Sequence, residues 1–312
     1  MDASQSGVAE LLRSRLGGRS GNSGNRDDGA TLALVIEGGG MRGMLSATMA
    51  AVLADRGLVD AVDLVVGTSA GAANATAVAA GTIGAFSESY ASVFASPEYI
   101  GAGRMLRRKS MVDTRGITAR SAELFEWSLA LREGAPRLAA VATDVVTAKA
   151  VPLTDFTDAT DLADSVIASS QLPLAGGLPV TVRGRRWLDG GLVEAVPVAS
   201  AAALGATHAI VLVTRPFGTA PAYGPADRVI ERYLRRVNPE LGDLYRGRPE
   251  RYRSTVAEMR AGGYAGVRTL TFAPAVDDPI PGRTETDIHL LRVAREAATA
   301  TATRMLEAAG LA

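Results

Sequence analysis

The sequence VDLVVGTSAGAANATAVAA, at residues 62–80, joins an apolar run, a serine between glycines and a series of small residues. The run at 62–66 predicts a buried strand, and the residues at 70–80 predict a helix. Ser69 therefore lies on a sharp strand-to-helix turn, the context in which G-x-S-x-G presents a nucleophile. The small neighbours leave room for the two chain directions to approach each other. We call residues 67–71 the nucleophile turn; the residues that flank Ser69 in it are Gly67, Thr68, Ala70 and Gly71.

A second glycine-rich turn precedes this unit in the chain. Residues 31–36 predict a buried strand, and residues 44–56 predict a helix that stops at Gly57. Glycines at such a turn permit backbone angles that let amide groups converge on an anion. The turn consists of Glu37, Gly38, Gly39, Gly40, Met41, Arg42 and Gly43.

This glycine loop has three functional interpretations beside that of a plain tight turn. The spacing of its glycines fits the dinucleotide fingerprint, but that motif needs an acidic residue at the end of the second strand. Asp60 and Asp63 flank the start of that strand instead. A P-loop would need a Gly-Lys-Ser/Thr ending, which the loop lacks. We favour the third interpretation, an oxyanion hole, because the loop lies one strand–helix unit before Ser69.

Three later segments contribute candidate site features. Residues 180–188 predict a hairpin that delivers Asp189, followed by Gly190 and Gly191, although Asp-Gly-Gly alone usually marks a turn. The apolar, proline-bounded loop at 171–179 fits either the wall of an acyl pocket or a packed loop. The irregular segment at 100–117 is basic, which fits a solvated surface or contact with an anionic head group. Its basic residues are Arg104, Arg107, Arg108, Lys109 and Arg115.

Composition excludes several classes of function. The chain has 312 residues with 33 basic and 33 acidic side chains, so its net charge favours neither nucleic acid nor an anionic membrane. The absence of cysteine excludes disulfides, thiolate metal sites and a cysteine nucleophile, and two histidines are too few for a histidine-rich metal site. Neither a signal peptide nor a membrane-spanning segment is predicted, so we expect a cytoplasmic protein. We expect a flexible arm at 1–29, a catalytic core at 30–215 and a mainly helical extension at 216–312.

Three ordered motifs together resemble the patatin-like phospholipase family. They are Gly38 to Gly43, Gly67 to Gly71 and Asp189 to Gly191, and the sequences at 142–144 and 168–173 also look like bacterial members. The resemblance covers about residues 32–214. It implies a three-layer α/β/α fold with a central, mostly parallel sheet. One departure is Glu37, where plant storage members have aspartate.

The resemblance also implies a mechanism. Ser69 would match the family's nucleophile and Asp189 its base, in a Ser–Asp dyad that uses no histidine. The amides around Gly39, Gly40 and Met41 would match the oxyanion hole, with Arg42 beside it. The implied activity is hydrolysis of phospholipid or lysophospholipid esters. No metal site is visible in the sequence, and we expect neither a metal nor a cofactor. The expected partner is a lipid or ester substrate; peripheral membrane contact and the oligomeric state stay open, and no nucleic acid is expected.

Other interpretations stay open. The order Ser69, Asp189 and then His208 or His289 also fits the triad of an α/β-hydrolase. His208 lies in a predicted buried strand at 207–214, and His289 lies near the start of a predicted terminal helix, so we interpret both as structural. A carboxylesterase acting on small soluble esters is an alternative enzyme. A catalytically silent lipid-binding or regulatory protein of the same fold is the alternative outside enzymes.

Overall fold

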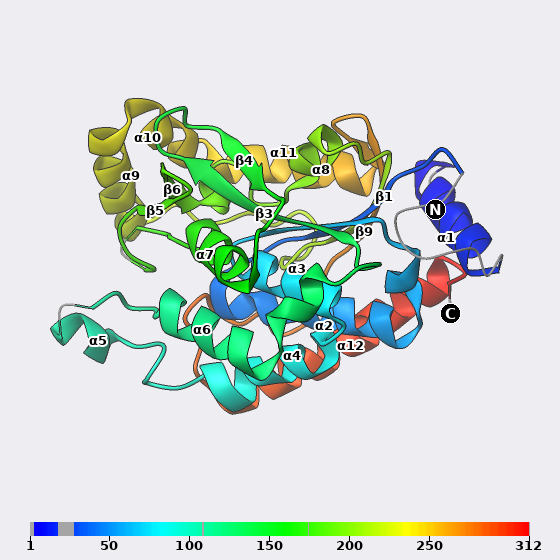
Figure 1. The fold of residues 1–312 in the computed structure, drawn as a ribbon, viewed down its shortest axis with the longest axis horizontal. Helices are drawn as coiled ribbons and strands as arrows, with labels where there is room; N and C mark the ends of the chain where they lie inside the picture. Colours follow the sequence, from blue (N-terminus) through cyan, green and yellow to red (C-terminus); the bar gives the residue numbers. More distant parts are fainter. Residues whose placement is uncertain (1–2, 18–27, 108, 174, 312) are drawn as a thin grey trace.

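The computed structural model describes residues 3–17, 28–107, 109–173 and 175–311. A sheet lies between two layers of helices (Figure 1), which confirms the predicted α/β/α class. Its strands are β1 (Leu32–Ile36), β2 (Leu64–Thr68), β3 (Arg137–Asp144), β4 (Ala150–Leu153), β5 (Val180–Val182), β6 (Arg185–Asp189), β7 (His208–Leu212), β8 (Gly263–Tyr264) and β9 (Val267–Phe272).

The α-helices are distributed along the whole described chain. They are α1 (Ala3–Gly17), α2 (Gly43–Asp55), α3 (Ala70–Ala80), α4 (Ile83–Ser89), α5 (Ala102–Leu106), α6 (Thr114–Leu124), α7 (Ala159–Ser169), α8 (Val198–Ala203), α9 (Pro225–Val237), α10 (Pro239–Arg246), α11 (Arg248–Arg260) and α12 (Ile288–Ala308). A π-helix at Tyr90–Phe94 continues α4, and 3-10 turns lie at Gly40–Arg42, Leu58–Ala61, Trp127–Leu131 and Gly190–Leu192. In the described part of the chain, no helix combines the length and apolar character needed to cross a membrane.

The sheet has a parallel centre with antiparallel edges. Its order is β5-β6-β3-β2-β1-β7-β9-β8, with β4 paired to β3. Strands β3, β2, β1, β7 and β9 run parallel, whereas β4, β5, β6 and β8 join through antiparallel pairs. Parallel strands place their carboxyl ends at one edge of the sheet, where α/β proteins bind ligands. The nucleophile turn follows β2 at this edge.

Alternate residues of β1 supply the two cores because successive side chains in a strand point to opposite faces. Leu32, Leu34 and Ile36 pack in a core that includes α2, α3 and α12. Ala33 and Val35 pack in a second core with α8 and α11. Both faces of the parallel centre are therefore covered, which explains why its strands are continuous apolar runs.

The two ends of the chain are more closely tied to the sheet than the sequence indicated. Helix α1 buries Val8, Ala9 and Leu12, and Arg15 forms an ion pair with Asp63 at 2.6 Å. This segment of the expected flexible arm is therefore packed; residues 1–2 and 18–27 lie outside the described residues. At the other end, β9 pairs with β7, so the segment after residue 215 contributes a strand to the central sheet as well as helices.

Candidate active site

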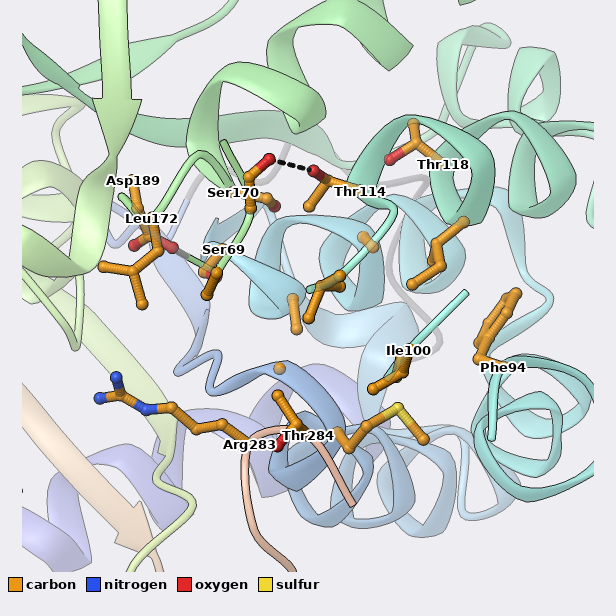
Figure 2. Close-up of a pocket in the computed structure, with 18 of the residues that line it drawn as sticks. Ser69, Phe94, Ile100, Thr114, Thr118, Ser170, Leu172, Asp189, Arg283 and Thr284 are labelled. Carbon is orange, nitrogen blue, oxygen red and sulfur yellow. Dashed lines mark hydrogen bonds between the residues drawn. The ribbon is translucent and has the colours of Figure 1, made fainter. Parts of the chain in front are cut away.

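Strand β3 brings Ser69 and Asp189 together. Strand β2 ends with Thr68 beside Val141, and β6 arrives from the opposite direction to end with Asp189 beside Ala142. Both strands lie along the same edge of β3, because β4 occupies the other edge at these positions. The serine that follows β2 thus meets the aspartate that ends β6, and both residues line the same two pockets with their side chains close together (Figure 2).

The turn that carries Ser69 is strained and closely packed. Ser69 has φ 58° and ψ −131°, a conformation that costs a non-glycine residue roughly 1–3 kcal/mol. A Cβ atom on Gly67 would lie 2.0 Å from the carbonyl oxygen of Gly71, and one on Gly71 would lie 2.3 Å from that of Ile36. Both glycines are therefore required by close approach of the backbone. Thr68 donates a hydrogen bond to the Glu194 carbonyl at 3.3 Å.

Ser169, at the end of α7, holds the turn against the sheet. Its hydroxyl accepts a hydrogen bond from the Ser69 amide at 2.8 Å and donates one to the Val141 carbonyl at 2.6 Å. Ser169 lies in the segment 168–173 that resembles bacterial family members, but its pattern predicted no role for this residue. Its neighbour Gln171 supplies the carbonyl that accepts from the Asp189 amide at 3.0 Å. The segment 169–171 therefore contacts both members of the Ser69–Asp189 pair.

The glycine loop lies directly against the nucleophile turn. A Cβ atom on Gly38 would lie 2.2 Å from the Thr68 carbonyl oxygen and 2.9 Å from the Ala70 amide nitrogen. Gly39 and Gly40 have φ of 147° and 59°, in the region that favours glycine. The loop therefore packs close to Ser69, as the interpretation of an oxyanion hole requires.

The amides of the loop differ in whether they are already bonded. Those of Gly39 and Gly40 donate to no acceptor in the described part of the chain. The Met41 amide, by contrast, donates to the Arg283 carbonyl at 3.0 Å. The amide of Gly43 donates back to the carbonyls of Gly40 and Met41. Of the three amides implied by the resemblance, only those of Gly39 and Gly40 are open to a ligand.

Arg42 belongs to a buried polar network behind the loop. Its Nε donates to the Thr214 hydroxyl at 3.1 Å, and the Thr214 amide donates to the Glu37 carboxylate at 2.6 Å. The Tyr252 hydroxyl also donates to Glu37, at 2.9 Å. Burial, reinforced by the positive charge of Arg215, lowers the pKa of Arg42 to about 10. Glu37 thus ties the loop to the segment that follows β7.

Asp189 is a buried carboxyl with few partners. It is 6 % exposed and accepts a hydrogen bond from the Gly191 amide at 2.7 Å. Burial raises the pKa of Asp189, while the bonds from Ser69 and Gly191 and the charge of Arg248 act in the opposite direction. A Cβ atom on Gly190 would lie 2.1 Å from the Val141 carbonyl oxygen, so the residue after Asp189 must be glycine. A carboxyl with a raised pKa is a better base than an exposed aspartate.

An apolar pocket opens at Ser69. Its lining includes Phe86, Tyr90 and Phe94 from α4 and the π-helix that continues it, and Ile117 and Val166 from α6 and α7. The Tyr90 hydroxyl, the polar tip of this aromatic group, is itself bonded to the Asn74 side chain at 2.8 Å. In Figure 2, Phe94 and Ile100 lie at the opposite side of this pocket from Ser69 and Asp189. The mostly apolar lining of the pocket suits an acyl chain.

The loop at 171–179 contributes Leu172, Ala175 and Gly176 to this pocket. This agrees with its interpretation as a pocket wall, one of the two that its sequence allowed. Leu174 lies outside the described residues. The basic segment at 100–117 contributes little charge to the site, because Arg104 pairs with Asp113 at 2.7 Å. Arg107, Lys109 and Arg115 are exposed, and Arg108 lies outside the described residues.

The two histidines lie apart from the pair. His208 starts β7 beside Leu32, at the end of the parallel strands opposite to Ser69, and its ring contacts the Thr207 hydroxyl at 2.9 Å. His289 is exposed at the start of α12. Neither histidine lines a pocket with Ser69. Within the described ranges, no three histidine, aspartate or glutamate side chains are grouped to hold a metal ion.

Comparison with known protein families identifies the family of this chain. The model of the patatin-like phospholipase family matches residues 34–202, which is more than half of the chain. The chain therefore belongs to the patatin-like phospholipase family, a family of lipid acyl hydrolases. No curated protein matches the sequence. Among solved structures, VipD from Legionella pneumophila is similar with a TM-score of 0.43 and 12% identity, covering 89% of this chain and 67% of VipD.

Proposed function

We propose that this protein is a serine acyl hydrolase that cleaves phospholipid or lysophospholipid esters through a Ser69–Asp189 dyad. The observation that carries the proposal is the meeting of these two residues at adjacent strand ends, where both line the apolar pocket. The glycine loop, whose Gly39 and Gly40 amides are open, lines a pocket together with Ser69. An acyl chain in the pocket would bring its ester carbonyl to Ser69.

The reaction proceeds in two halves. Asp189 takes the proton of the Ser69 hydroxyl as its oxygen attacks the ester carbonyl. The amides of Gly39 and Gly40 donate to the developing oxyanion, and one such donor contributes about 3–4 kcal/mol to transition-state stabilisation. Asp189 then returns the proton to the leaving alcohol. Water hydrolyses the acyl-enzyme by the same steps in reverse order.

Hydrolysis of a lipid panel tests this function. Because the pocket is apolar, we expect faster release of fatty acid from long-chain lysophosphatidylcholine or phosphatidylcholine than from p-nitrophenyl acetate at equal concentration. The measurement is product formation with purified protein, with Ser69→Ala as the blank. Preference for the short nitrophenyl ester would favour the carboxylesterase, and no hydrolysis of any ester would favour the silent lipid-binding protein.

A double histidine variant tests whether the dyad needs a third member. We expect His208→Gln/His289→Gln to keep kcat/KM within about threefold of the wild type, because neither ring is near Ser69. Circular dichroism and thermal unfolding establish that the variant is folded. A folded variant that has lost activity would replace the dyad by a triad.

A further inference from the structure

A second, polar pocket adjoins the apolar one. Both pockets are lined by Gly40, Ser69, Leu172, Asp189 and Arg283, so they meet at the proposed nucleophile. Figure 2 shows the Arg283 side chain extending away from Phe94 and Ile100, on the side where Asp189 lies. A substrate held at Ser69 would therefore have apolar surroundings in one direction and arginine in the other.

The polar pocket holds more positive than negative charge. Its charged lining consists of Arg42, Arg248 and Arg283 against Glu37 and Asp189. The Glu37 carboxylate already accepts hydrogen bonds from Thr214 and Tyr252. Protonation of Asp189 during the reaction would further reduce the negative charge.

Arg248 and Arg283 lie in this pocket without a direct ion pair to a described residue, although the charges of Asp189 and Glu37 act on Arg248. Neither forms an ion pair within the ranges that the structure describes. The Nε atom of Arg248 is buried and has no hydrogen-bond partner there. Burial, and then the positive charge of Arg283, lower the pKa of Arg248 to about 10, so the guanidinium stays charged at neutral pH. A buried charge with an unbonded donor is costly unless an anion is bound.

We propose that Arg248 and Arg283 bind the phosphate of a head group attached to the ester that Ser69 attacks. This assignment rests on the proposed function and names its substrate class. The guanidinium fork matches phosphate oxygens. A glycerophospholipid carries an acyl chain on one side of its ester and a phosphate a few atoms away on the other, as the two pockets require. Neutral glycerides lack the group that would fill the polar pocket.

Matched substrates test the assignment. The measured quantity is the ratio of kcat/KM for 1-acylglycerol 3-phosphate to that for the 1-monoacylglycerol of the same chain length. We expect Arg248→Gln to lower this ratio by about tenfold or more, because hydrogen bonds to charged groups are lost only with the phosphate substrate. Arg292→Gln, at an exposed position on α12, should keep the wild-type ratio. Equal losses on both substrates would mean that Arg248 acts on Asp189 alone and would overturn the assignment.

A second variant protects the test against misfolding. Arg283→Gln should also lower the ratio, and the contact of residue 283 with Met41 uses its main-chain carbonyl, which the substitution keeps. Thermal unfolding checks both variants. If both fold and the ratio is unchanged in each, the phosphate subsite is contradicted.

A binding measurement separates this inference from the proposed function. Calorimetry with Ser69→Ala protein should detect glycerol 3-phosphate but not glycerol, and Arg248→Gln added to that protein should weaken binding about tenfold or more. If Ser69→Ala binds in this way and the wild-type protein hydrolyses no ester, the subsite is upheld and the hydrolase is contradicted. Ester hydrolysis without such binding would do the opposite. Arg248-dependent binding of inorganic phosphate with an unaltered substrate ratio would indicate a free-anion site and overturn the head-group assignment.

Discussion

Ser69→Ala is expected to lower kcat for lipid ester hydrolysis by about four to six orders of magnitude. Without the hydroxyl no acyl-enzyme can form, and only the glycine amides and the pocket remain to assist attack by water. Alanine and serine differ by one oxygen, so the packing of Gly38 and Gly67 around the turn is retained. The measurement is fatty acid release from the lipid that the panel identifies as the best substrate.

The control for this variant is Ser254→Ala, at an exposed position on α11, which should hydrolyse the same lipid at the wild-type rate. Thermal unfolding of Ser69→Ala should occur within a few degrees of the wild type. Substantial residual hydrolysis by a pure, folded Ser69→Ala protein would show that another group attacks the ester.

Asp189→Asn is the second large effect, with an expected fall in kcat of about 10²–10⁴-fold, the usual contribution of a general base. The amide has nearly the same shape and can still accept from Gly191, but it cannot take the proton of Ser69. Asp277→Asn, at an exposed position, is the matched control and should not alter kcat. Full activity in the Asp189→Asn protein would exclude this carboxyl as the base.

The same variant has a predicted effect on stability and on pH dependence. Since burial raises the pKa of Asp189 above its unfolded value, ionising this group disfavours the folded state, and the penalty grows as pH rises from the unfolded pKa to the folded one. At pH 7 the free energy of unfolding of Asp189→Asn should therefore equal or exceed that of the wild type. In the wild type, kcat/KM should fall as pH falls through the raised pKa, because the protonated carboxyl is no base.

The sequence was sufficient to predict the part of the site built from local patterns. An apolar run, a serine between glycines and a helix lie within about twenty residues of each other, and steric limits leave few ways to arrange them. Asp189 was harder, because Asp-Gly-Gly marks many turns. Only the order of the three motifs, carried by the family resemblance, distinguished it.

The remaining features depend on contacts between distant segments. Arg248 and Arg283 belong to no motif, and their place beside Ser69 follows from how the segment after β7 folds back over the site. Ser169 lies in the segment 168–173 of the family resemblance, yet its bond to the Ser69 amide depends on the way α7 packs against β3. The bonded state of the Met41 amide depends likewise on the Arg283 carbonyl. Long-range placement of this kind has no signal in local composition.

The central claim is that Ser69 is activated directly by Asp189 without a histidine. The most direct measurement is covalent labelling by a fluorophosphonate probe, with the adduct located by peptide mass spectrometry in four proteins: the wild type, Ser69→Ala, Asp189→Asn and the double histidine variant. We predict an adduct on Ser69 in the wild type, an equal labelling rate in the histidine variant, a much slower rate in Asp189→Asn and no adduct in Ser69→Ala. An adduct on another residue, or labelling that is lost with the histidines and kept without Asp189, would contradict the account.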